Sequence, residues 1–139
     1  MKLKKLNSDK YVSININKYK IDWDGKSASS LQKQVKDFLR QFWQGQIVCE
    51  EMRIPGSLYR CDFVNFNKNI VIEFSPGFHR SYHKFFHKGS RLNYLKQLRK
   101  DSAKELWAEA NNFKFVDIYE EDLPNLDRRW FKEKYQIEL

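Results

Sequence analysis

The sequence predicts a mixed α/β domain in which two strands precede the element order αβββαβα. Two segments carry apolar residues at the three- and four-residue spacing of helices, and several short segments alternate between apolar and polar residues. Turn residues separate these segments. The 139 residues, 41% of them hydrophobic, suit a single domain (1–139) with a sizeable core.

The N-terminal part, residues 1–26, is predicted to form a β-hairpin extension. Residues 11–21 alternate around Asn17-Lys18, which predicts a turn with Ile14, Ile16, Tyr19 and Ile21 facing inward. A helix is expected over 31–43, with Ser27 or Ser29 as its N-cap and Gln44-Gly45 at its end. Its apolar stripe consists of Leu31, Val35, Phe38, Leu39 and Phe42.

Three strands are predicted over 47–52, 58–66 and 70–74. Turn residues at Pro55-Gly56 and at 67–69 favour an antiparallel meander. The longest helix is expected over 91–111, followed by a strand over 113–119 that an α-helical crossover would make parallel to its neighbour. The inward positions of that helix are predicted to be Leu92, Leu95, Leu98, Ala103, Leu106, Trp107 and Ala110.

A final helix is predicted over 121–135, within a C-terminal segment of 121–139. Residues 27–120 then form the core of the domain. Cys49 and Cys61 both lie in strand-like runs, and buried free thiols in a reducing compartment are expected in preference to a disulfide.

The net charge of +8 predicts a polyanionic partner, either nucleic acid or an anionic membrane surface. No apolar run of about 18 residues is present, so a spanning helix is not expected. The first residues do not resemble a signal peptide, and we therefore expect a cytoplasmic protein.

Two acids lie near the ends of the second predicted hairpin. Asp62 is next to Cys61 and Phe63, and Glu73 follows a run of three aliphatic residues. An unpaired carboxylate would be costly among such neighbours, and two carboxylates at one strand edge suit a divalent cation. The alternative is that both are solvated charges at a hairpin edge.

His79 follows Glu73 by six residues and could reach the same edge as a general base or acid. His79, His83 and His87 are spaced by four, so a three-histidine metal site is the alternative. Surface histidines among basic residues need no metal, which favours a role for His79 alone.

The segment 80–104 is strongly basic and contains a single acid, Asp101. Such a run is typical of a phosphate-binding surface, although a solvated helix face is the alternative. Asp101 could orient Arg99 or His79, could join the metal site, or could form an ordinary ion pair on the helix. The cations are Arg80, Lys84, Lys88, Arg91, Lys96, Arg99, Lys100 and Lys104.

The order of these motifs resembles the PD-(D/E)XK restriction-endonuclease-like superfamily, over roughly residues 31–119. It is most similar to the branch of very-short-patch-repair-type nucleases and small phage homing endonucleases. The motifs that carry the resemblance are Arg60-x-Asp62, Ile72-Glu73, His79, and the helical Arg99-x-Asp101-x-x-Lys104. The resemblance implies a restriction-endonuclease-like αβββαβ core with a mixed sheet.

The resemblance also implies roles for individual residues. Asp62 and Glu73 would be the metal ligands, with a backbone carbonyl near Phe74, and His79 would be the histidine after the turn. Asp101 and Lys104 would be the helix acid and cation. Glu51 or Glu50 would be an extra acid, which the superfamily often keeps on the preceding helix, where this chain offers only Gln32, Gln34 and Asp37.

One departure from the superfamily pattern concerns its usual lysine, which would fall at Ser75 in this chain. Lys104 could supply that cation from the helix. Otherwise the site would be weakened, and the chain would act as a DNA-binding module.

The sequence therefore predicts a Mg²⁺-dependent DNA endonuclease, with Mn²⁺ able to substitute. The expected biology is a phage-type, free-standing homing or nicking endonuclease in the host cytoplasm. Its partner would be double-stranded DNA and not a membrane, and symmetric cutting of both strands would require a homodimer. RNA processing is a further alternative. The residues expected to contact DNA are Arg80, Lys84, Lys88, Arg91, Arg99 and Lys100.

Overall fold

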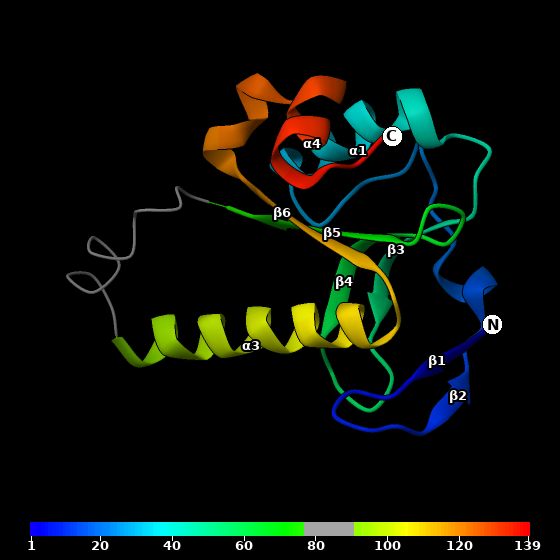
Figure 1. Cartoon of the computed structure of the whole chain (residues 1–139). Helices are drawn as coiled ribbons and strands as arrows, with labels where there is room; N and C mark the ends of the chain where they lie inside the picture. Colours follow the sequence, from blue (N-terminus) through cyan, green and yellow to red (C-terminus); the bar gives the residue numbers. More distant parts are fainter. Residues whose placement is uncertain (77–90) are drawn as a thin grey trace.

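A four-stranded mixed sheet forms the middle layer of the molecule (Figure 1). The computed structural model describes residues 1–76 and 91–139, and for 91–99 and Asp101 it describes the backbone alone. The strand order is β3-β4-β5-β6, with bounds Val48–Arg53, Arg60–Asn65, Ile70–Ser75 and Lys114–Tyr119. The β3-β4-β5 meander is antiparallel and β6 runs parallel to β5, so both predictions are confirmed.

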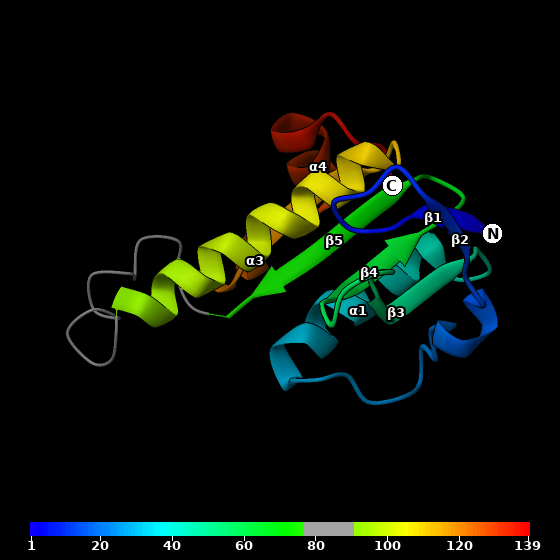
Figure 2. The same cartoon turned by 90° about the horizontal axis from the view of Figure 1, so that it is seen from below.

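Helices cover both faces of the sheet (Figure 1). The α1 (Ser30–Trp43) and α4 (Arg128–Tyr135) helices lie on one face, and α3 (Arg91–Ala110) lies on the other. Seen from below, α3 runs along β5 (Figure 2). A mixed α/β fold with an N-terminal hairpin and a C-terminal helix is therefore confirmed.

The N-terminal hairpin lies earlier in the chain than predicted. It pairs β1 (Lys2–Lys4) with β2 (Tyr11–Ser13), and Asn7 in its turn has a φ of 55°. The predicted second strand is wrong, because Ile16–Tyr19 forms a 3-10 helix, η1. This turn brings Lys20 to a bridge with Cys49, and the segment runs along the edge of β3 instead of folding back.

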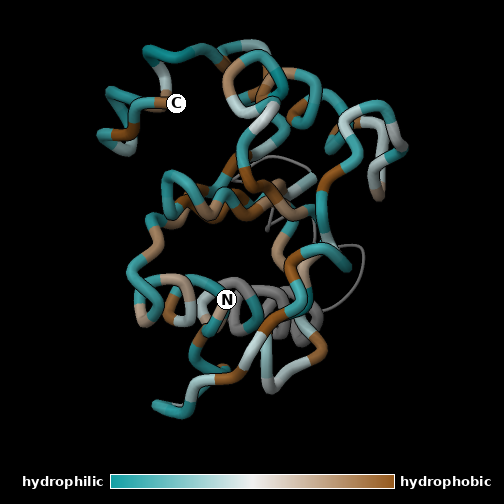
Figure 3. Tube along the Cα trace, turned by 90° about the vertical axis from the view of Figure 1, so that its right-hand side faces the viewer, coloured by the Kyte–Doolittle hydropathy of each residue, from teal (hydrophilic) through white to brown (hydrophobic). Residues whose placement is uncertain are grey.

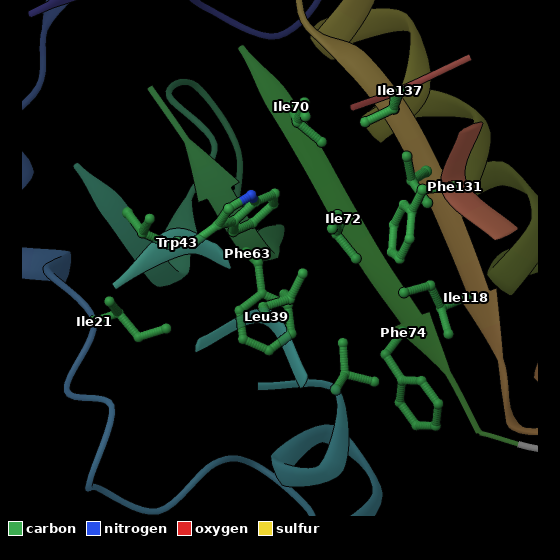
Figure 4. Close-up of a cluster of buried hydrophobic side chains, with 13 residues drawn as sticks. Ile21, Leu39, Trp43, Phe63, Ile70, Ile72, Phe74, Ile118, Phe131 and Ile137 are labelled. Atoms are coloured by element: carbon green, nitrogen blue, oxygen red, sulfur yellow. The ribbon is translucent and has the colours of Figure 1, made fainter. Parts of the chain in front are cut away.

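The α1 helix begins where predicted. The Ser29 hydroxyl accepts a hydrogen bond from the Gln32 N–H at 3.1 Å, which satisfies a donor of the first turn. On its apolar face Val35, Leu39 and Trp43 are fully buried. They pack with strand and C-terminal residues such as Phe63, Ile72 and Phe131 in the first core (Figure 4).

A second core lies between the sheet and α3. It contains Cys49, Cys61 and Val64 from the strands, and the two cysteines are free and buried as expected. The α3 helix contributes Trp107 and Ala108, whereas Leu106 and Ala110 are exposed, so these two predicted inward positions are wrong. The inward stripe runs from position 104 through 107 and 108 to 111, which places Lys104 on the buried face. Hydrophobic stretches concentrate along the central strands (Figure 3).

The C-terminal helix is shorter than predicted. Glu120–Asn125 forms a 3-10 helix, η2, which contains Pro124, and α4 starts only after Asp127. The Asp127 carboxylate caps α4 by accepting from the Trp130 N–H at 2.7 Å, which a continuous helix would forbid. Beyond α4, Ile137 is buried in the first core. Among the described helices, none has the length and apolarity needed to cross a membrane.

Candidate functional site

Asp62 and Glu73 meet where the pairing of β4 and β5 ends. The ladder continues to Phe63↔Ile72, and the next position would pair Asp62 with Glu73. At that position, hydrogen bonds from backbone N–H groups to the two side-chain carboxylates take the place of backbone-to-backbone hydrogen bonds between the strands. The Asp62 N–H donates to Glu73 Oε2 at 2.7 Å, and the Phe74 N–H donates to Asp62 Oδ2 at 2.8 Å. Both carboxylates are thereby held in the gap between the two strands.

Lys104 reaches this gap from α3. Its ammonium forms an ion pair with Glu73 Oε1, and the two side chains are only 7% and 6% exposed. Burial alone would lower the pKa of Lys104, but the adjacent Glu73 carboxylate outweighs burial and raises this pKa above its ordinary value. Lys104 therefore stays charged, and it neutralises one of the two carboxylates.

The second carboxylate, that of Asp62, accepts from the Phe74 N–H but has no cationic partner among the described residues. Burial and the nearby charge of Glu73 raise the pKa of Asp62 from 3.8 to about 8. None of the described cations forms an ion pair with Asp62. Burial, with a further contribution from Glu73, also holds the pKa of the Cys61 thiol well above its usual range. Two acids thus lie beside one lysine, and the raised pKa of Asp62 keeps this second acid mostly protonated near neutral pH.

The backbone beside Asp62 departs from regular strand geometry. Glu51 occupies the register position opposite Asp62 and has a φ of 54°, which is uncommon for a residue with a side chain. Cys49 and Met52 are three positions apart yet join the same core, whereas strict alternation would place them on opposite faces. The alternation on β4 reverses in the same way, between Cys61 and Val64. Strain concentrated at this point is typical of functional sites.

A second polar cluster lies on the α1 side of the sheet. Glu50 accepts from the Ser27 hydroxyl at 2.6 Å and from Gln32 Nε2 at 3.2 Å, and it pairs with Lys36 Nζ at 2.9 Å. Gln32 Nε2 also lies 3.1 Å from Glu51 Oε1. Sequence reasoning missed Lys36 and the linking role of Gln32. A signal was available, because both polar residues fall on the apolar face of α1.

The structure therefore brings together three of the predicted catalytic residues: Asp62, Glu73 and Lys104. Glu51 is tied to Gln32 and does not contact them through any hydrogen bond or ion pair found in the described part of the chain. Ser75, where the superfamily lysine would fall, ends β5 and is half-buried.

The other predicted site residues stay predictions. Lys100 is half-buried on α3, one helical turn before Lys104. Arg91, Arg99 and Asp101 also belong to α3, but their side chains are outside the described atoms. The remaining predicted residues lie outside the described residues altogether: His79, Arg80, Lys84 and Lys88.

The Asp62–Glu73 pair fits a hard divalent cation. Carboxylate oxygens are the ligands that Mg²⁺ and Mn²⁺ prefer, and a bound cation would stabilise the ionised form of Asp62 that burial and Glu73 disfavour. No cluster of three or more His, Cys, Asp or Glu side chains suited to a metal exists among the residues at 1–76 and 91–139 whose side chains are described. The described acids would therefore supply two ligands, and the others would come from the backbone or the substrate.

Comparisons of the chain with family models, with curated proteins and with solved structures find no match.

Proposed function

We propose that this protein is a metal-dependent endonuclease that hydrolyses phosphodiester bonds in DNA. One observation carries the proposal: the buried Glu73, which pairs with the buried Lys104, and the half-buried Asp62 come together from adjacent strands at the point where the strands separate. An ordinary surface ion pair would require neither a buried environment nor a second carboxylate beside the first. The net charge of +8 supports a polyanionic substrate.

The chain's own groups have distinct roles in this proposal. Asp62 and Glu73 would hold a divalent cation, which when bound polarises the phosphate and lowers the pKa of an attacking water. Lys104 holds Glu73 in place through their ion pair, and it adds a fixed positive charge where the charge of the phosphate develops. It thereby takes the role of the superfamily lysine that Ser75 cannot fill. His79 is proposed as the general base or acid, as expected from the sequence.

Cleavage of supercoiled plasmid with Mg²⁺ or Mn²⁺ tests the proposal. We expect relaxation or linearisation by the wild type, and loss of both in Asp62→Asn and Glu73→Gln. Asp24→Asn is the matched control, because Asp24 is an exposed acid whose ion pair with Arg40 lies at the surface. The ratio of relaxed to linear product separates nicking from double-strand cutting.

Three outcomes are informative. Cleavage that persists in both variants would remove the metal site from the proposal. DNA binding without cleavage, on a substrate pool of randomised sequence as well as on plasmid, would instead support the non-catalytic binding module. Cleavage of single-stranded RNA in preference to DNA would assign the site to RNA processing.

A further inference from the structure

An open groove lies at the same end of the sheet as the Asp62–Glu73 pair. It has a volume of about 600 Å³ and is bounded by residues 18–28, by β3 and by the start of β4. The chain from η1 to α1 passes beside β3 (Figure 2). Because β3 ends and β4 begins at this end, Glu51 in the groove wall lies at the register position opposite Asp62.

The groove is rich in positive charge. Among the described residues that line it, six are cationic and three are acidic. Glu50 is neutralised by Lys36 within the buried cluster, and the Glu51 carboxylate accepts from Gln32. A cleft lined mainly by one sign of charge concentrates ions of the opposite sign. The groove is therefore suited to an anionic ligand.

Three of the six cations are available to such a ligand. Lys20, Lys26 and Arg60 are exposed, and none of them forms an ion pair with another described residue. The other three are engaged: Lys36 with Glu50, Arg53 with the Ser57 carbonyl at 2.6 Å, and Lys18 over the Tyr19 ring.

The groove wall is held in place before any ligand arrives. Lys33 Nζ donates to the Trp23 carbonyl at 3.0 Å and Lys36 Nζ donates to the Gly25 carbonyl at 3.2 Å, so two turns of α1 fix the loop. The shape argues for a polymer over a small molecule. Small-molecule sites are mostly enclosed and apolar, whereas this groove is open and is lined mainly by polar and charged residues.

We propose that this groove binds the sugar-phosphate backbone of the DNA strand beside the phosphate that is cut, through Lys20, Lys26 and Arg60. Arg60, which lines the groove, precedes Asp62 by two residues, roughly 7 Å along a strand, so the groove lies at the end of the sheet where the carboxylate pair lies. The inference rests on the proposed nuclease function, and it adds a surface on the β3 side of the site to the basic run predicted over 80–104.

The test compares two charge-matched triple variants in metal-free buffer. The groove variant is Lys20→Gln/Lys26→Gln/Arg60→Gln, and the control is Lys132→Gln/Lys134→Gln/Arg129→Gln on α4, which does not line the groove. The Kd of a fluorescein-labelled DNA duplex is measured by anisotropy over a series of salt concentrations. Thermal melts verify that all proteins are folded.

We expect the groove variant to bind at least about 10-fold more weakly, and its slope of log K against log salt to be smaller by about 2–3. The control should keep most of the wild-type slope. In cleavage assays with Mg²⁺, the groove variant should raise KM more than it lowers kcat.

The outcomes separate the inference from the function on which it rests. Equal effects of the two triple variants would show that net charge alone matters and would overturn the groove. Unchanged binding by the groove variant, in a protein that binds and cleaves DNA, would also overturn it while leaving the nuclease intact. A wild type that binds no DNA would overturn both proposals.

Discussion

Glu50 and Glu73 are both buried glutamates paired with a lysine from a helix, but they lie on opposite sides of the sheet in different settings. Glu50 pairs with Lys36 of α1 and also accepts from Ser27 and Gln32. Glu73 pairs with Lys104 of α3, and the hydrogen bonds around it join it to a second carboxylate, Asp62. The balanced cluster has one acid for its lysine, whereas the unbalanced cluster around Glu73 has two acids for one lysine.

This difference indicates that the Glu50 cluster is structural and that the Glu73 cluster has a different role, although each contains a glutamate paired with a lysine. Around Glu50 the charge is neutralised and the carboxylate oxygens are bonded, as expected of a structural ion pair. Around Glu73 two acids share one ammonium, and the pKa of Asp62 is raised to about 8, because burial and Glu73 both disfavour its charge. An acid that is costly to ionise is typical of a functional site, where a bound cation would stabilise the ionised form.

The largest expected effect concerns the balanced cluster. Lys36→Met should lower the free energy of unfolding by about 3–5 kcal/mol, because it leaves Glu50 buried without its counter-charge. Chemical denaturation measures this loss. Lys132→Met, which breaks an exposed pair with Glu138, should cost no more than about 1 kcal/mol. Similar losses in the two variants would show that the Glu50 cluster is not structural.

The second-largest effect concerns plasmid cleavage, which should depend on the lysine of the Glu73 cluster and not on the lysine of the Glu50 cluster. Lys104→Met should reduce the rate of plasmid cleavage per folded molecule by about 100-fold, or roughly 2.7 kcal/mol, because Glu73 loses the ammonium that positions it. Lys36→Met should retain its rate once its folded fraction is taken into account. If both lysine variants lose activity equally, the contrast between the two clusters fails.

A smaller effect is expected in the pH dependence of stability without metal. The folded pKa of Asp62 is about 8, above the ordinary 3.8, so the folded chain retains a proton that the unfolded chain releases between these values. The stability linked to Asp62 is fully present below about pH 4 and is lost as the pH rises through about 8.

Asp62→Asn removes this dependence, because asparagine keeps an acceptor for the Phe74 N–H and carries no charge. Urea unfolding in EDTA should show the variant to be more stable than the wild type at pH 8, by about 1–3 kcal/mol, and nearly equal to it at pH 4. A variant that is less stable at both pH values would mean that the Asp62 carboxylate is well solvated.

Much of the fold follows from patterns that burial imposes on the sequence. The α1 helix and the central strands each have one or two faces against a core, so their spacing of apolar residues identifies them. The predictions fail where local turns decide the structure. The alternation over 11–21 is ended by a 3-10 turn at Ile16–Tyr19, and the last helix is divided by the Asp127 cap.

The residues of the candidate site also fall into two groups: those that the sequence could identify and those that only the fold reveals. Asp62, Glu73 and Lys104 could be selected from the sequence because each is a charge among apolar neighbours or belongs to a spaced motif. Lys36 and Gln32 could be noticed as polar residues on the apolar face of α1, but their partners could not be predicted, because these depend on how α1 is rotated over β3. The groove itself was equally hidden, because no charge run in the sequence marks cations such as Lys20 and Lys26, which only the fold brings together.

The smallest expected effect is stabilisation by Mg²⁺, and it tests the unbalanced cluster directly. A ligand at ten times its Kd that binds only the folded state stabilises that state by about 1.4 kcal/mol, which shows as a rise in Tm. We expect this rise for the wild type and for Glu50→Gln, but not for Asp62→Asn or Glu73→Gln. The rise should grow between pH 6 and pH 9, roughly, because Mg²⁺ and a proton compete for Asp62. An equal rise in all four proteins would place Mg²⁺ elsewhere, and the second acid beside Glu73 would then need an explanation other than a metal.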